Sequence, residues 1–135
     1  MLCLPVEHPR AEESVIDLRN LADEPFVMFE REMNPANHDA LIGLFSQAGI
    51  HPRIVHYTRN WMTTVSMVSE GCGMAIVPGT LCRMRMRMAG VRLVPLAGAA
   101  VPARGMLVWN PTFVTPGLER FLESATRTLA GLSPK

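Results

Sequence analysis

The sequence predicts an α/β fold with a mainly parallel sheet. Short apolar runs alternate with amphipathic segments along the 135 residues, and only a few residues separate each run from the next segment. Hydrophobic residues make up 48% of the chain and charged residues 19%, which is typical of one globular domain that buries its own core. The formal net charge is +1, so the overall charge gives no reason to expect a polyanionic partner.

Six apolar runs predict the strands of this sheet. They are too short for helices, and several are rich in β-branched and aromatic residues, as buried strands are. A polar stretch or a proline follows most of them and indicates where each strand ends. The expected strands are residues 2–6, 25–29, 53–57, 74–77, 91–94 and 106–109.

Five segments between and after these runs predict helices, because their apolar positions recur at helical spacing or lie between helix-capping residues. The expected helices are residues 18–22, 37–48, 58–70 and 80–88, and a last helix that begins at 116. Their starts are marked by Asp17, by Thr58 or Asn60, and by Thr115 with Pro116; their ends are marked by Gly49, Gly71 and Gly90.

The residue patterns predict no enzyme, no metal site and no cofactor site. The three cysteines have no CxxC spacing and the four histidines are scattered, so we interpret the cysteines as buried thiols in a reducing compartment. Glu30, Glu32 and His56 are the best available catalytic groups, and no motif supports them. The glycines around Cys72 come after a helix and before a strand, the reverse of a phosphate-binding loop, and predict a tight turn.

The alternating Arg and Met residues at 83–88 are the most unusual stretch. We interpret them as a solvated arginine face over a methionine-filled core. A nucleic-acid patch is the alternative, and no aromatic stacking residues are interleaved to support it.

Polar side chains gather after two of the expected strands. Glu30 and Arg31 follow the strand that ends at Phe29, and Thr58, Arg59 and Asn60 follow the next strand. Ligands of open parallel sheets bind beyond the carboxyl ends of the strands, where helices begin. The second group suits an anion, because a helix N-terminus, a hydroxyl, an amide and a guanidinium can converge there; helix capping explains Thr58 and Asn60 equally well.

Five segments of the chain match, in order, one protein family. They are LPVEHP at 4–9, LADEPFV at 21–27, AGIHP at 48–52, VSEGCGMAIVP at 68–78, and VPL at 94–96 with VW at 108–109. Together they resemble the effector-binding domain of LysR-type transcriptional regulators. The resemblance covers nearly the whole chain, and it departs from the family at Cys72 and in the Arg and Met stretch.

The resemblance implies a periplasmic-binding-protein-like fold of type 2, in which two α/β lobes hold a small-molecule inducer between them. Residues 8–103 correspond to the second lobe, and residues 1–7 and 104–135 to parts of the first. A DNA-binding domain is expected only in a missing N-terminal part, so DNA is a partner only through that part. We expect a cytoplasmic bacterial protein without membrane contact, and a homo-oligomer, because residues 2–6 and 106–109 would otherwise be unpaired strand edges.

By position, the resemblance also implies a set of inducer-binding residues at the strand ends. The set is Phe29, Glu30, Arg31, Thr58, Arg59, Asn60, Met62 and Pro78. The predicted function is the effector-binding part of a regulator that senses a small, anionic metabolite and modulates DNA binding of the intact protein. The alternative is a stand-alone periplasmic-type small-molecule-binding module, which requires an export signal that we do not find at residues 1–10.

Overall fold

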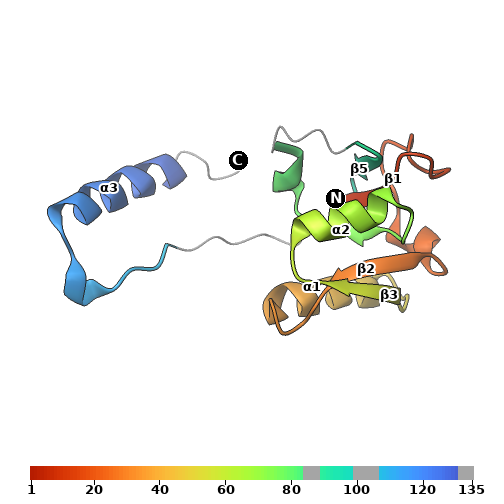
Figure 1. Cartoon of the computed structure of the whole chain (residues 1–135), viewed down its shortest axis with the longest axis horizontal. Helices are drawn as coiled ribbons and strands as arrows, with labels where there is room; N and C mark the ends of the chain where they lie inside the picture. Colours follow the sequence, from red (N-terminus) through yellow and green to blue (C-terminus); the bar gives the residue numbers. More distant parts are fainter. Residues whose placement is uncertain (84–88, 99–106, 131–135) are drawn as a thin grey trace. The chain divides into compact units, whose positions relative to one another are not determined.

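The computed structural model describes residues 1–83, 89–98 and 107–130 (Figure 1). Contacts between residues divide the chain into two compact units, Met1–Ala103 and Arg104–Lys135. The first unit contains the sheet and two helices, and the second contains a third helix.

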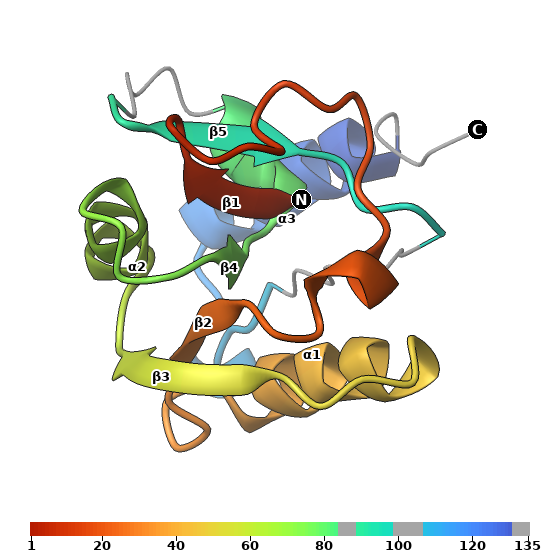
Figure 2. The same ribbon diagram turned by 90° about the vertical axis from the view of Figure 1, so that its right-hand side faces the viewer.

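Five strands in the described ranges form the sheet of the first unit. They are β1 (Leu2–Pro5), β2 (Pro25–Phe29), β3 (Arg53–Thr58), β4 (Ala75–Ile76) and β5 (Val91–Val94). β1 lies between β4 and β5, and β2 pairs with β3. A bridge between Phe26 and Met74 joins the two groups, with the amide of Val27 donating to the Met74 carbonyl over 2.7 Å. Figure 2 shows the resulting order β5-β1-β4-β2-β3.

The sheet is mixed, which corrects the expectation of mainly parallel pairing. β2 and β3 are parallel, and the bridge to Met74 is also parallel. β1, however, is antiparallel to both of its neighbours. It therefore runs in the opposite direction to the other four strands, which are parallel to one another. β1 is also paired along both edges, so residues 2–5 are not the unpaired strand edge that we expected.

Two helices cover opposite faces of this sheet. α1 spans Pro35–Gln47 and α2 spans Trp61–Ser69. Alternate residues of the strands face opposite sides: Leu2 and Leu4 pack in one core cluster with Phe45 of α1, whereas Cys3 packs in a second cluster with Val68 of α2. The α/β class and the helices at these places are confirmed.

The chain reverses its direction across the sheet at β3. From β2 it passes through α1 to β3 on one side, and from β3 it returns through α2 to β4 on the other side. Such a reversal places two helix starts beside the carboxyl ends of adjacent strands, which is where ligands of open α/β sheets bind. On this topology, we expect ligand-binding residues directly after β2, β3 and β4.

The turn between α2 and β4 depends on glycine. Gly71 has a φ of 75° and Gly73 a φ of 142°, values that favour glycine. A Cβ atom at Gly73 would lie 2.8 Å from the carbonyl oxygen of Pro25, so this residue also lets β4 approach β2. The turn expected around Cys72 is confirmed, although Cys72 is only half-buried whereas Cys3 is buried.

Short 3₁₀ helices complete the connections. They are η1 (Leu18–Leu21), η2 (Gly79–Arg83) and η3 (Pro111–Phe113). Asp17 caps η1 as expected, because its side chain accepts the amide of Arg19. The helix expected at 80–88 is present as η2 up to Arg83, and the Arg and Met stretch at 84–88 lies outside the described residues.

The second unit consists of η3 and α3 (Pro116–Ala130). Thr115 caps α3, since its hydroxyl oxygen accepts the amide of Leu118 over 3.2 Å. The strand expected at 106–109 is wrong for its described residues, because 107–109 have no strand structure. Apolar side chains stay exposed here, including Val108 at 86% and Phe113 at 73%.

Candidate functional site

The chain just beyond β2 is hydrogen-bonded to the last residue of β3. The amide of Glu30 donates to the carbonyl of Thr58 over 2.9 Å, which aligns Glu30 with the residues that enter α2. Nε of Arg59 then donates to Oε2 of Glu30 over 2.7 Å. This pair lies at the surface, with 68% of the Arg59 side chain and 31% of the Glu30 side chain exposed, and it leaves the terminal nitrogens of the guanidinium available to a further acceptor.

α2 begins with a side-chain cap. Oδ1 of Asn60 accepts the amide of Thr63 over 2.8 Å, and the carbonyl of Asn60 accepts the amide of Thr64 over 3.1 Å. The first amides of a helix have no intrahelical acceptor, so those of Trp61 and Met62 remain directed outward. The helix macrodipole adds partial positive charge at the same place.

An aromatic pair borders the start of α2. The ring of Phe29, at the end of β2, lies 4.3 Å from the ring of Trp61, centroid to centroid, with a tilt of 53°. Trp61 is half-buried, and the neighbouring Met62 side chain is 54% exposed. Trp61 is not among the site residues expected from the sequence; its place as the first residue after the Asn60 cap is the signal that could have identified it.

Two hydroxyls are buried beneath this helix start. Thr58 is 4% exposed and Thr64 is 1% exposed, and their Oγ1 atoms lie 2.7 Å apart. The Thr58 hydroxyl is therefore directed into the protein, whereas the side chains of Arg59 and Asn60 are at the surface.

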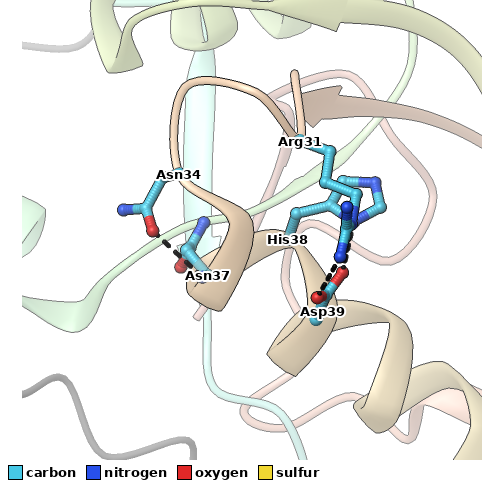
Figure 3. A network of polar contacts seen from close by, with 5 residues as sticks. All are labelled: Arg31, Asn34, Asn37, His38 and Asp39. Atoms are coloured by element: carbon cyan, nitrogen blue, oxygen red, sulfur yellow. Dashed lines mark hydrogen bonds and ion pairs between the residues drawn. The ribbon is translucent and has the colours of Figure 1, made fainter.

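The start of α1 forms a second cluster of polar side chains at the same edge of the sheet (Figure 3). Asn34 caps the helix by accepting the amide of Asn37 over 3.1 Å, and Pro35 has no amide hydrogen to present. Nδ2 of Asn37 is buried and has no hydrogen-bond partner within the described residues. The helix expected over 37–48 thus begins two residues earlier, at Pro35; the Asn34-Pro35 dipeptide is the signal for the earlier start.

Arg31 is directed toward α1. Its Nε and Nη2 donate to the two carboxylate oxygens of Asp39, each over 2.8 Å, and Nδ1 of His38 lies 3.3 Å from Oδ1 of Asp39. Hydrogen bonds from Arg31, and then from His38, lower the pKa of Asp39 from 3.8 to about 2. The same ion pair raises the pKa of Arg31.

The structure thus brings together some of the eight residues that the sequence selected and separates others. Phe29, Glu30, Thr58, Arg59 and Asn60 meet at the ends of β2 and β3. Pro78 is half-buried after β4, on the opposite flank of β2 from Thr58.

No group of three or more His, Cys, Asp or Glu side chains within 1–83, 89–98 and 107–130 could hold a metal ion. In the same ranges, no helix combines the length and the hydropathy that crossing a membrane requires.

Comparison with known proteins gives a consistent result. The family model described as LysR substrate binding domain matches residues 1–130. The chain is 32% identical to the HTH-type transcriptional regulator TtuA of Agrobacterium vitis over 127 residues, and 37% identical to the HTH-type transcriptional regulator IlvR of Caulobacter vibrioides over 114 residues. These matches cover 91% and 84% of this chain.

The chain spans about two fifths of the length of these relatives, 41% of TtuA and 38% of IlvR. Among solved structures, the effector binding domain of QuiR in complex with shikimate superposes with a TM-score of 0.65 at 21% identity. That superposition covers 94% of this chain and 59% of the QuiR chain. It supports the periplasmic-binding-protein-like fold of type 2.

Proposed function

Because this chain belongs to the LysR substrate binding domain family, we propose that it is the effector-binding part of a transcriptional regulator whose effector is a small carboxylate bound at the start of α2. The observation that carries the proposal is the convergence of three features at one place. They are the outward amides of Trp61 and Met62, the cap at Asn60 and the partly free guanidinium of Arg59.

The ion pair of Arg59 with Glu30 is compatible with anion binding. A single Nε contact joins the two side chains, and exposed ion pairs contribute only about 0–1 kcal/mol. An incoming carboxylate can therefore accept from the terminal guanidinium nitrogens without the loss of a strong interaction. Charge-assisted hydrogen bonds of this kind are shorter and stronger than neutral ones.

The other residues of the set have supporting roles in this proposal. Phe29 and Met62 provide apolar surface for the body of the effector, beside the ring of Trp61. Arg31 and Pro78 form the outer borders, after β2 and β4 respectively. Thr58 supports the start of α2 from below.

Transmission to DNA is proposed as a population shift. An effector that binds one arrangement of the regulator better than another biases the oligomer toward that arrangement, and the size of the shift equals the difference in binding free energy. In this proposal the intact protein is a homo-oligomer that contacts DNA through a separate helix-turn-helix region, and it has no catalytic role.

The test measures binding of two carboxylates, benzoate and shikimate, to the full 135-residue chain by calorimetry, with Arg59→Ala as the diagnostic variant. Loss of a hydrogen bond to a charged group costs about 1.5–3 kcal/mol, so we expect the Kd to rise by about one to two orders of magnitude. Arg53→Ala is the matched control, because Arg53 is an exposed arginine at the opposite end of β3.

Arg53→Ala should bind the carboxylates as the unmodified chain does. Equal weakening in both variants would indicate attraction by net charge alone, and full affinity in Arg59→Ala would place the effector elsewhere. If neither benzoate nor shikimate binds the unmodified chain, the proposed ligand class is contradicted.

A further inference from the structure

The two buried hydroxyls under α2 connect its first turn to the end of β3. Thr58 is the last residue of β3, and Thr64 lies in the first turns of α2. In the described part of the chain they are the only buried polar residues. Buried hydroxyls are costly unless they are hydrogen-bonded, and these two satisfy each other over 2.7 Å.

The distances to the available acceptors favour one direction of donation within the pair. The Thr64 hydroxyl donates to the carbonyl of Asn60 over 3.0 Å. A hydroxyl has one proton to donate, so Thr64 then accepts, and the Thr58 hydroxyl donates to it. The carbonyl of Met28, at 3.4 Å from Oγ1 of Thr58, is the more distant alternative acceptor.

This chain of hydrogen bonds ends on the residue that caps the helix. The backbone carbonyl of Asn60 is held by the Thr64 hydroxyl from inside, while its side chain holds the amide of Thr63 at the surface. The position of Asn60 in turn sets the direction of the amides of Trp61 and Met62, which follow it directly.

We propose that Thr58 and Thr64 are positioning residues that fix the first turn of α2 on the end of β3, so that the outward amides are pre-organised for an acceptor. The inference rests on the proposed carboxylate site and extends it to two residues that do not touch the ligand. Thr58 therefore acts through Thr64 and Asn60 rather than by contact with the effector.

Substitutions at both positions separate the hydroxyl from the methyl group. Thr58→Ser removes only the γ-methyl group, and Thr58→Ala removes the hydroxyl as well, so the two variants differ by the hydrogen bond alone. Thr64→Ser and Thr64→Ala give the same comparison from the other partner. Thr58→Val, which keeps the shape and loses the hydroxyl, is the second variant if the alanine variants do not fold.

The first measurement is amide hydrogen exchange of the ligand-free chain. The amides of Thr63 and Thr64 report on the start of α2, and the amide of His38, bonded to the carbonyl of Asn34 over 3.0 Å, reports on the start of α1. Local opening controls such exchange, so in the alanine variants we expect exchange at Thr63 and Thr64 to accelerate by roughly tenfold, with His38 unchanged and the serine variants within about threefold of the parent.

The second measurement is the Kd for benzoate in the same variants. We expect it to rise by roughly tenfold in the alanine variants and to be restored in the serine variants. Unchanged exchange at α2, equal acceleration at His38, or parental affinity in the alanine variants would each overturn the positioning role. If benzoate does not bind the parent chain, the proposed function fails, and the exchange data alone decide whether the pair fixes α2.

Discussion

The two helices that begin at the carboxyl edge of the sheet are held there by different interactions. At α1, Arg31 crosses the connecting loop to Asp39, and 63% and 52% of these two side chains are exposed. At α2, Thr58 and Thr64 share a hydrogen bond that is almost completely buried. Both helices have an asparagine cap.

This difference predicts how each helix start responds to perturbation. Exposed ion pairs are screened by salt and contribute about 0–1 kcal/mol. Removal of one partner of a buried hydrogen bond leaves the other unsatisfied and costs about 1–3 kcal/mol. The start of α1 should therefore depend on pH and ionic strength, and the start of α2 on the identity of its buried residues.

The largest expected effect tests whether α1 is held by its packing rather than by its surface charges. The ring of Phe45 packs edge-on against Phe26, with centroids 4.9 Å apart, and it is 1% exposed. Phe45→Ala should lower the free energy of unfolding by about 3–5 kcal/mol, measured by urea denaturation. Gln47→Ala, an exposed position at the end of the same helix, is the control and should be nearly neutral.

If Phe45→Ala lowers the free energy of unfolding by less than about 1 kcal/mol, the surface interactions of α1 matter more for its stability than its buried face. That result would contradict the view that packing holds this helix.

An intermediate effect distinguishes the two caps. Alanine at an asparagine cap costs about 0.5–2 kcal/mol. Proline at the first helical position already fixes φ for α1, so we expect Asn34→Ala to fall near the lower limit and Asn60→Ala near the upper limit. Urea denaturation of both variants gives the two values, and serine at each position, which also caps helices, should restore stability. Equal decreases in the free energy of unfolding for Asn34→Ala and Asn60→Ala would show that the caps do not contribute to the difference between the two helix starts.

The sequence predicted the strands better than the helix starts. β2 and β5 have the expected bounds, because short apolar runs between turn residues leave few alternatives. α1 begins at Pro35 and not at residue 37, since the Asn34 side chain adds the first turn. The same combination of a capping residue and proline correctly predicts the start of α3 at Pro116, and it is equally present at Asn34 and Pro35.

Other parts of the site depend on geometry that local patterns do not contain. The contact between Thr58 and Thr64 requires the angle between β3 and α2, and the contact between Phe29 and Trp61 requires the pairing of β2 with β3. Residues 107–109 have the composition of a strand, but a strand also needs a hydrogen-bonded neighbour, and none of the described strands pairs with them. Strand composition therefore predicts a tendency, and pairing decides the outcome.

The smallest expected effect on stability concerns the charges at α1. Arg31 and His38 lower the pKa of Asp39 to about 2 in the folded chain, from 3.8. A carboxylate whose pKa is lower in the folded state stabilises that state at pH above about 4, and this contribution disappears as the pH falls through about 2. Because both side chains are exposed, the change in unfolding free energy should be small, and the pKa itself is the better measurement.

In Arg31→Ala, carboxyl carbon chemical shifts followed against pH should show the pKa of Asp39 returning most of the way to 3.8, with the remainder due to His38. Asp17 provides an internal control in the same titration, because Arg19 holds its pKa at about 2 and Arg31 takes no part in that pair. A pKa of Asp39 that stays near 2 in the variant would mean that His38 or the helix itself sets it. The start of α1 would then not be held by the exposed ion pair, and the contrast with α2 would rest on the buried hydroxyls alone.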